Sequence, residues 1–154
     1  MPKKDSVRQF LLAISFDHLP PEVIEQAKIC CFDLLGTAVG GSRSRTASII
    51  TQHALDHFGA GTNITAVQPL LGGNPISPVG AALVGAAMID ALDCHDGQRD
   101  TKGHVGCSML PSLIAVLESQ SRPVTGSELI SLIVAGYEIG TRAGMALHGT
   151  VTDY

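Results

Sequence analysis

The sequence predicts an all-α fold of about six helices in one domain, and three observations support this class. Of the 154 residues, 45% are hydrophobic and the mean hydropathy is positive, so the chain can bury a substantial core. Tryptophan is absent and only 4% of residues are aromatic, which favours closely packed helices over a β-sandwich. Apolar residues also recur at helical spacing along most of the chain.

The N-terminal part of the chain predicts three helices. The first is amphipathic and covers about residues 6–16. The second begins after Pro20, because the following proline is tolerated in a first helical turn, and it ends at Gly40-Gly41. The third covers about residues 45–58 and carries its apolar residues on one side.

The rest of the chain predicts three more helices after a turn-rich segment. This segment covers residues 61–77, and a short extended stretch at Ile64–Val67 is the one β-like feature expected. A buried helix begins at Ser77 and is followed, beyond a polar loop, by a helix over about residues 108–119. The last helix opens at Thr125–Glu128, which has the spacing of a capping box.

Three glycines four residues apart, Gly136, Gly140 and Gly144, share one face of the last predicted helix. Each glycine costs about 1 kcal/mol of helix propensity relative to alanine. We therefore predict that this face presses against another helix, in this chain or in a partner chain. The alternative is a helix that frays after Gly136.

Charge, apolar run length and cysteine spacing exclude several classes of protein. The net charge is −4 and the basic residues are scattered, so we expect no nucleic-acid partner. The longest apolar run, Val79–Ile89, is shorter than the roughly 20 residues that cross a bilayer, so we expect no membrane partner. The cysteines lack CxxC spacing, which favours reduced thiols and a cytoplasmic location.

The most polar stretch, residues 88–111, lies between two apolar segments, where enzymes often present catalytic groups. Asp90 and Asp93 are three residues apart at the end of the buried helix, which predicts that they share one face. The helix dipole is negative at that end and the two carboxylates repel each other. This arrangement is more typical of proton transfer than of stability.

The second half of this polar stretch predicts a place for a small carboxylic acid. His104 lies shortly before the next helix, whose free N–H groups, with Gly103 and Gly106, would cradle an anion. Lys102 would add a fixed positive charge. His95 and Asp96 would supply or orient a further proton-transfer group.

Two other interpretations of this stretch stay open. It can be a polar turn whose side chains satisfy helix ends. Its two histidines, with Asp93 and Asp96, could also converge on a metal ion, although neither calcium-loop nor zinc spacing fits. His53 and His57 lie one turn apart in the third helix, but no third ligand is in view. We expect no metal and no cofactor.

Three stretches carry a resemblance to a known family. They are LPPEVIEQAKICCFDLLGTAVGG, then GAALVGAAMIDALDCHDG followed by GHVGCSMLPSLIAVLE, and finally VAGYEIGTRAGMALHGTVTDY. The chain resembles the N-terminal part of the MmgE/PrpD family, which includes 2-methylcitrate dehydratase, cis-aconitate decarboxylase and iminodisuccinate epimerase. The resemblance implies an all-helical domain and a homodimer. Members continue into a second, α+β domain, so residues 1–154 look like a truncated copy that lacks it.

The resemblance also places residues of this chain in the family's pattern. A decarboxylase-like D-F-D-D-T segment followed by H-P-S puts its first Asp on Asp93 and its His on His104. The second Asp becomes His95 and the Thr becomes Gly97. The K-G-H-x-G motif at residues 102–106 is more similar to the motif of an epimerase-like branch.

This resemblance implies acid/base chemistry on a di- or tricarboxylic acid. Dehydration, epimerisation and decarboxylation all break a bond next to a carboxylate, whose growing charge must be neutralised. In this hypothesis Asp93 and His104 transfer protons, and Lys102 and the helix start near Ser108 hold the carboxylate. As a second base, an epimerase would use one of two residues, Cys107 or Tyr137. The alternative to this lyase or isomerase is a catalytically inactive helical dimerisation fragment or remnant.

Overall fold

The computed structural model describes residues 4–120 and 122–150, and these form six α-helices and one 3-10 turn. The elements are α1 (Lys4–Ala13), η1 (Phe16–His18), α2 (Pro21–Gly41), α3 (Arg45–His57), α4 (Pro78–Asp90), α5 (Gly106–Ser119) and α6 (Gly126–His148). No strand occurs among the described residues, which confirms the all-α prediction. The expected extended stretch reduces to one antiparallel bridge, in which Val67 and Ile76 exchange N–H···O bonds of 2.9 and 3.0 Å.

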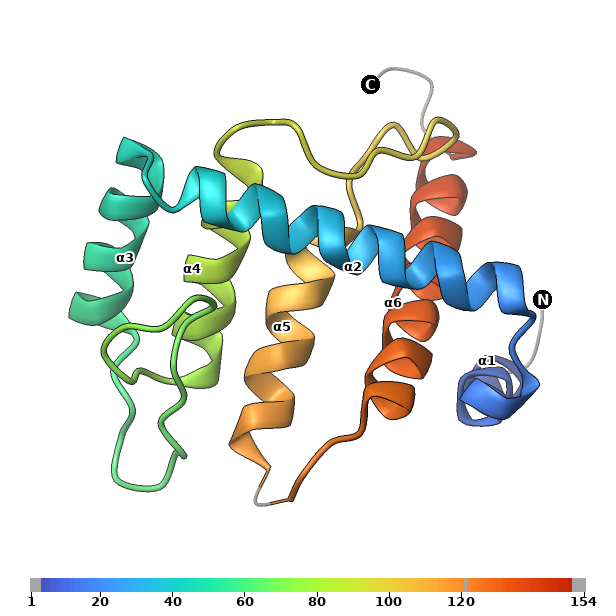
Figure 1. The fold of residues 1–154 in the computed structure, drawn as a ribbon, viewed down its shortest axis with the longest axis horizontal. Coiled ribbons are helices and arrows are strands. Elements are labelled where there is room, and N and C mark those ends of the chain that lie inside the picture. Colours follow the sequence, from blue (N-terminus) through green and yellow to red (C-terminus); the bar gives the residue numbers. More distant parts are fainter. Residues whose placement is uncertain (1–3, 121, 151–154) are drawn as a thin grey trace.

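The helices form two layers (Figure 1). α3, α4, α5 and α6 follow one another across the molecule, and α2 crosses α4, α5 and α6, against all of which it packs. The loop of residues 91–105 joins α4 to α5 and reaches the C-terminal end of α6 on the way. It is therefore held over one end of the layer, where three helices meet.

Side-chain caps define where three of the helices begin. The hydroxyls of Ser44, Ser77 and Thr125 each accept the backbone N–H three residues further on, at 3.0, 3.2 and 3.1 Å. Such a cap typically contributes about 1 kcal/mol. The predicted helix starts at Ser77 and Thr125 are thus confirmed.

The core lies between α2 and the other layer. Leu34, Ile89, Leu110 and Ile133 come from α2, α4, α5 and α6 respectively, and all four side chains are fully buried. Burying one such side chain contributes roughly 1.5–3 kcal/mol. A second cluster around Val84 joins α4 to α3 and to the bridged segment.

The glycine face of α6 packs against other segments of this chain. A Cβ on Gly140 would lie 2.5 Å from Val105, and one on Gly144 would lie 2.8 Å from Thr101. At Gly136, the side chain of Met109 of α5 occupies the space that a Cβ would need. Only Gly136 therefore faces another helix, and the other two glycines make room for the loop. The alternative of fraying after Gly136 is wrong, because α6 continues to His148.

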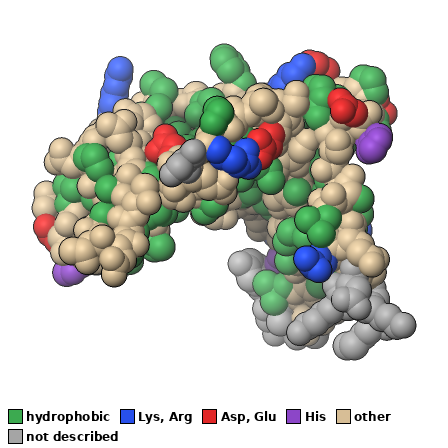
Figure 2. Space-filling view, turned by 90° about the horizontal axis from the view of Figure 1, so that it is seen from below, with side chains coloured by type: hydrophobic (Ala, Val, Ile, Leu, Met, Phe, Trp, Pro, Cys, Tyr) green, Lys and Arg blue, Asp and Glu red, His purple; other side chains and the backbone are tan. Residues whose placement is uncertain are grey.

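Charged side chains are few on the face seen in Figure 2, where acidic and basic groups lie among apolar ones without a basic stripe. None of the described helices has the length and apolar character needed to cross a membrane.

Candidate active site

The loop of residues 91–105 has a fixed backbone. The N–H of Gln98 donates to the carbonyl of Gly103 at 3.1 Å, and its side-chain oxygen accepts the N–H of Thr101 at 2.6 Å. Thr101 is buried against Gly144 of α6, which anchors the loop. Lys102 next to it has a positive φ of 47° and is exposed.

Asp90 and Asp93 do not share a helical face, contrary to the prediction. α4 ends at Asp90, and Asp93 lies in the loop with a positive φ of 48°. The chain turns sharply there, because the N–H of Asp93 donates to the carbonyl of Asp90 at 3.0 Å. Each carboxylate consequently faces a different histidine: Asp90 lies near His95, and Asp93 lies near His104.

His104 is held in one tautomer with a free nitrogen toward solvent. Its Nδ1 contacts the carbonyl oxygen of Asp96, and a carbonyl can only accept, so Nδ1 carries the proton. Nε2 then has a lone pair in the neutral ring, and it lies 3.9 Å from Oδ1 of Asp93. The His104 side chain is 39% exposed and that of Asp93 87%. An accessible imidazole beside a carboxylate can both accept and donate a proton.

Asp96 occupies the anion cradle predicted at the start of the next helix. Its Oδ2 accepts the N–H of Gly106, the first residue of α5, at 3.1 Å. The carboxylate therefore complements the helix dipole and fixes the loop to α5. The Ser108 hydroxyl likewise donates within the first turn, to the carbonyl of Val105 at 3.3 Å. Of the groups expected to bind a substrate carboxylate, Lys102 is the exposed cation.

His95 is buried behind His104. Its side chain has no exposed surface, and the two rings pack with centroids 4.4 Å apart. Neither ring nitrogen of His95 has a hydrogen-bond partner, and Nε2 lies 3.6 Å from Oδ1 of Asp90. His95 thus packs against the His104 ring and does not face solvent.

The two residues expected as a second base hold their protons firmly. Burial raises the pKa of Cys107, and the carboxylates of Asp90 and Asp96 raise it further. Burial also raises the pKa of the Tyr137 phenol, and Asp96 adds to this effect. Both groups are neutral near pH 7, which argues against either as a base.

Sequence reasoning placed Gly106 in an anion cradle but did not predict the contacts that require a glycine there. A Cβ at this position would come within 2.6 Å of Asp96 Oδ1, of Leu34 and of the Tyr137 hydroxyl oxygen. These atoms converge on Gly106 from the loop, α2 and α6. The glycine near the start of this helix was visible in the sequence, but the three neighbours that require it come from distant segments.

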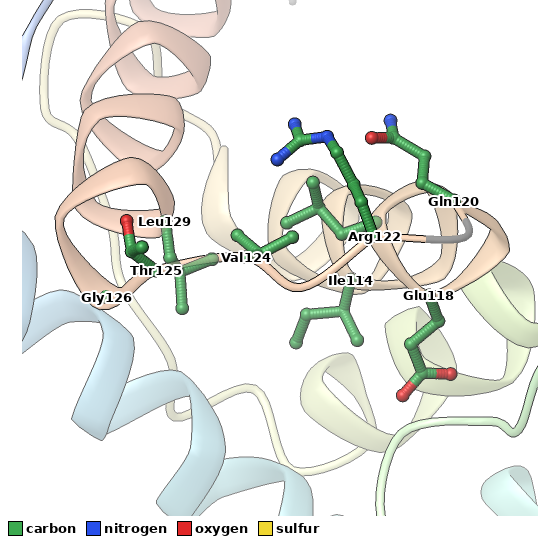
Figure 3. A pocket seen from close by; sticks show the side chains of 9 residues that line it. Ile114, Glu118, Gln120, Arg122, Val124, Thr125, Gly126 and Leu129 are labelled. Carbon is green, nitrogen blue, oxygen red and sulfur yellow. The ribbon is translucent and has the colours of Figure 1, made fainter.

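A pocket of about 400 Å³ lies at the opposite end of α5, between this end and the start of α6 (Figure 3). Arg122 lines it, but its guanidinium already pairs with both carboxylate oxygens of Glu128. None of the predicted site residues contributes to this pocket, so it is separate from the His104 loop.

The chain is similar in sequence to proteins of one known family. The model of the MmgE/PrpD N-terminal domain matches residues 6–153. A cis-aconitate decarboxylase of Aspergillus terreus is 27% identical over 140 residues, which are 89% of this chain and 28% of that protein. The cis-aconitate decarboxylase-like protein oryM of Aspergillus oryzae is 31% identical over 77 residues, or 47% of this chain and 16% of that protein. The chain thus spans less than a third of the length of these relatives.

Proposed function

Because the chain belongs to the MmgE/PrpD family, we propose that it forms the N-terminal domain of an enzyme that acts on a di- or tricarboxylic acid. The reaction is acid/base chemistry at a carbon next to a carboxylate. Similarity to cis-aconitate decarboxylases supports a lyase. The K-G-H-x-G sequence at residues 102–106 supports an epimerase as the second candidate.

In this proposal His104 transfers the proton. Its neutral Nε2 accepts a proton from the substrate carbon, and the imidazolium that results faces the Asp93 carboxylate 3.9 Å away. In the decarboxylation version the C–C bond to the departing carboxylate breaks, its electron pair stays on the substrate carbon, and protonated His104 supplies the proton that this carbon gains. Asp93 lies beside the ring whether His104 takes up or gives off the proton.

The substrate carboxylate needs a positive charge nearby, because negative charge grows next to it as the bond breaks. Lys102 is two residues before His104 and is exposed, which supports it as the group that binds this carboxylate. Asp96 fills the start of α5. We therefore assign carboxylate binding to Lys102 and a positioning role to Asp96.

The experiment that tests this proposal is ligand binding followed by turnover. We expect cis-aconitate and citrate to raise the melting temperature saturably, and acetate to leave it unchanged. K102Q should abolish the shift, whereas K28Q, a matched change at an exposed lysine of α2, should keep it. In a full-length enzyme that contains this domain, the loss of cis-aconitate, followed by NMR, should stop in D93N and H104Q while their circular dichroism stays native. Equal shifts in K102Q and K28Q would refute the assignment.

We also propose a homodimer in the cytoplasm. Four free cysteines support a reducing compartment. Exposed apolar residues on the outer face of α2 support self-association, which is tested below. An inactive dimerisation fragment is the alternative to either enzyme. It would dimerise without any carboxylate-dependent shift in melting temperature.

A further inference from the structure

From the residues behind His104, we propose a binding site for a zinc-class divalent cation formed by Asp90, His95 and Cys107. One ligand atom from each residue lies within 4.8 Å of the other two. They come from the last residue of α4, the loop and the first turn of α5. This inference is independent of the proposed carboxylic-acid chemistry, because none of the three transfers a proton in it.

The buried histidine is the observation that points to a ligand. The His95 side chain has no exposed surface, and neither ring nitrogen has a hydrogen-bond partner. A buried polar group without a partner costs about 1–3 kcal/mol. Its Nε2 faces Asp90 Oδ1 at 3.6 Å, beyond hydrogen-bond length. A cation between these two atoms would satisfy both.

The distances suit a metal after a small movement. Tetrahedral zinc, with bonds of about 2.0–2.3 Å, holds its ligand atoms roughly 3.3–3.6 Å apart. The Asp90 side chain is 68% exposed at the end of its helix, so it is free to close this gap and gives the ion a way in. Three protein ligands would leave a fourth position open, as in catalytic zinc sites.

The surrounding charge favours a cation. The C-terminal end of α4, where Asp90 lies, is the negative end of the helix dipole. A bound dication would hold the Cys107 sulfur as a thiolate.

The earlier expectation of no metal considered a different set of ligands. It weighed Asp93, His95, Asp96 and His104, but Asp96 caps α5 and the Nδ1 of His104 contacts a backbone carbonyl. Asp90 and Cys107 lie 17 residues apart in the chain, and only the packing of α4 on α5 brings them together.

Cobalt(II) tests this site directly, because a thiolate ligand produces a charge-transfer absorption in the near ultraviolet. The full 154-residue chain is stripped with EDTA, dialysed and titrated with Co²⁺, and zinc is then added to displace it. We expect the band to saturate at one equivalent and to disappear with zinc. Zinc alone should raise the melting temperature of the stripped protein.

Matched variants identify the ligands. C107S should remove the band, and C94S, at an exposed cysteine outside the cluster, should keep it. H95Q and D90N should weaken Co²⁺ binding at least tenfold, whereas H57Q should not. Circular dichroism of each metal-free variant verifies folding, and D90N changes an exposed group that folding does not require. A missing band in the wild type, or a band that survives in C107S, would overturn the proposal.

Discussion

At the scale of single residues, the geometry of the site depends on hydrogen bonds made by Asp96, which hold the loop and orient His104. The Asp96 carboxylate caps α5 through the N–H of Gly106, and the carbonyl of the same residue fixes the His104 tautomer. The Tyr137 hydroxyl approaches Asp96 across Gly106. Burial raises the pKa of this phenol, and the Asp96 carboxylate raises it further, so both favour the protonated form.

The variant Tyr137→Phe tests this effect through the pH dependence of the unfolding free energy. At pH 7 we expect the unfolding free energy to differ from that of the wild type by no more than about 1 kcal/mol, because the variant removes one neutral hydroxyl. The pKa of Tyr137 is raised in the fold, so the folded state binds this proton more tightly than the unfolded chain does. Above about pH 10, the ordinary tyrosine pKa, the wild type should lose stability that the variant keeps.

Urea unfolding at several pH values between about 7 and 11 measures this difference. Because both proteins share every other titrating group, their difference isolates Tyr137. Parallel curves over the whole range would contradict the predicted effect.

The predicted roles of Asp93 and His104 stay hypotheses. Their positions in the structure show how far the geometry of the site could be predicted from the sequence. Spacing alone put Asp93 on the helix with Asp90, which is wrong because the chain leaves the helix at Asp90. The proximity of Asp93 to His104 depends on the loop's left-handed turns at Asp93 and Lys102, which are uncommon for residues other than glycine. Local propensity gives no signal for such turns.

At the scale of elements, α6 positions the loop through its glycine face. Val105 and Thr101 lie where side chains at Gly140 and Gly144 would otherwise be. The four-residue spacing predicted a close contact correctly. The contacting segment is another helix at Gly136, as predicted, but at Gly140 and Gly144 it is the loop, because the pattern indicates only that space is needed and not what fills it.

Gly140→Ala and Gly36→Ala form a matched pair at this scale, since both glycines lie inside helices. At Gly36 nothing lies within 4 Å of an added Cβ, so alanine should stabilise by up to about 1 kcal/mol. At Gly140 the Cβ would lie 2.5 Å from Val105, and overpacking of about 1–3 kcal/mol should outweigh that gain.

Chemical denaturation measures both changes in unfolding free energy. Because Val105 adjoins His104, Gly140→Ala should also weaken the carboxylate-dependent thermal shift. Stabilisation of similar size in both variants would show that α6 does not press on the loop.

At the scale of the whole molecule, the helical class and helix order were predictable, because the core requires apolar residues at helical spacing. Leu34, Ile89, Leu110 and Ile133 all fall on such patterns. The crossing of α2 over the other helices was not predicted, since the periodicity of one helix does not specify its neighbour. The outer face of α2 stays apolar, with Ile29, Phe32 and Val39 exposed by 60, 81 and 49%.

Phe32→Ser tests whether this outer face of α2 forms the proposed dimer. The wild type should associate reversibly in sedimentation equilibrium, and the variant should bind itself at least tenfold more weakly. Unfolding free energy should change by less than about 0.5 kcal/mol, because the ring makes few contacts. Leu12→Ser removes a side chain that is 73% exposed on α1 and serves as the control. Equal association of both variants would exclude the outer face of α2.

The anchoring of Thr101 against Gly144 has a consequence for biosynthesis. Gly144 is made more than 40 residues after Thr101, so the ribosome must release most of α6 before the loop can adopt its final shape. α2, α4 and α5 can already pack against one another while the loop still lacks this support. The histidine pair is therefore among the last features of the domain to mature on the nascent chain.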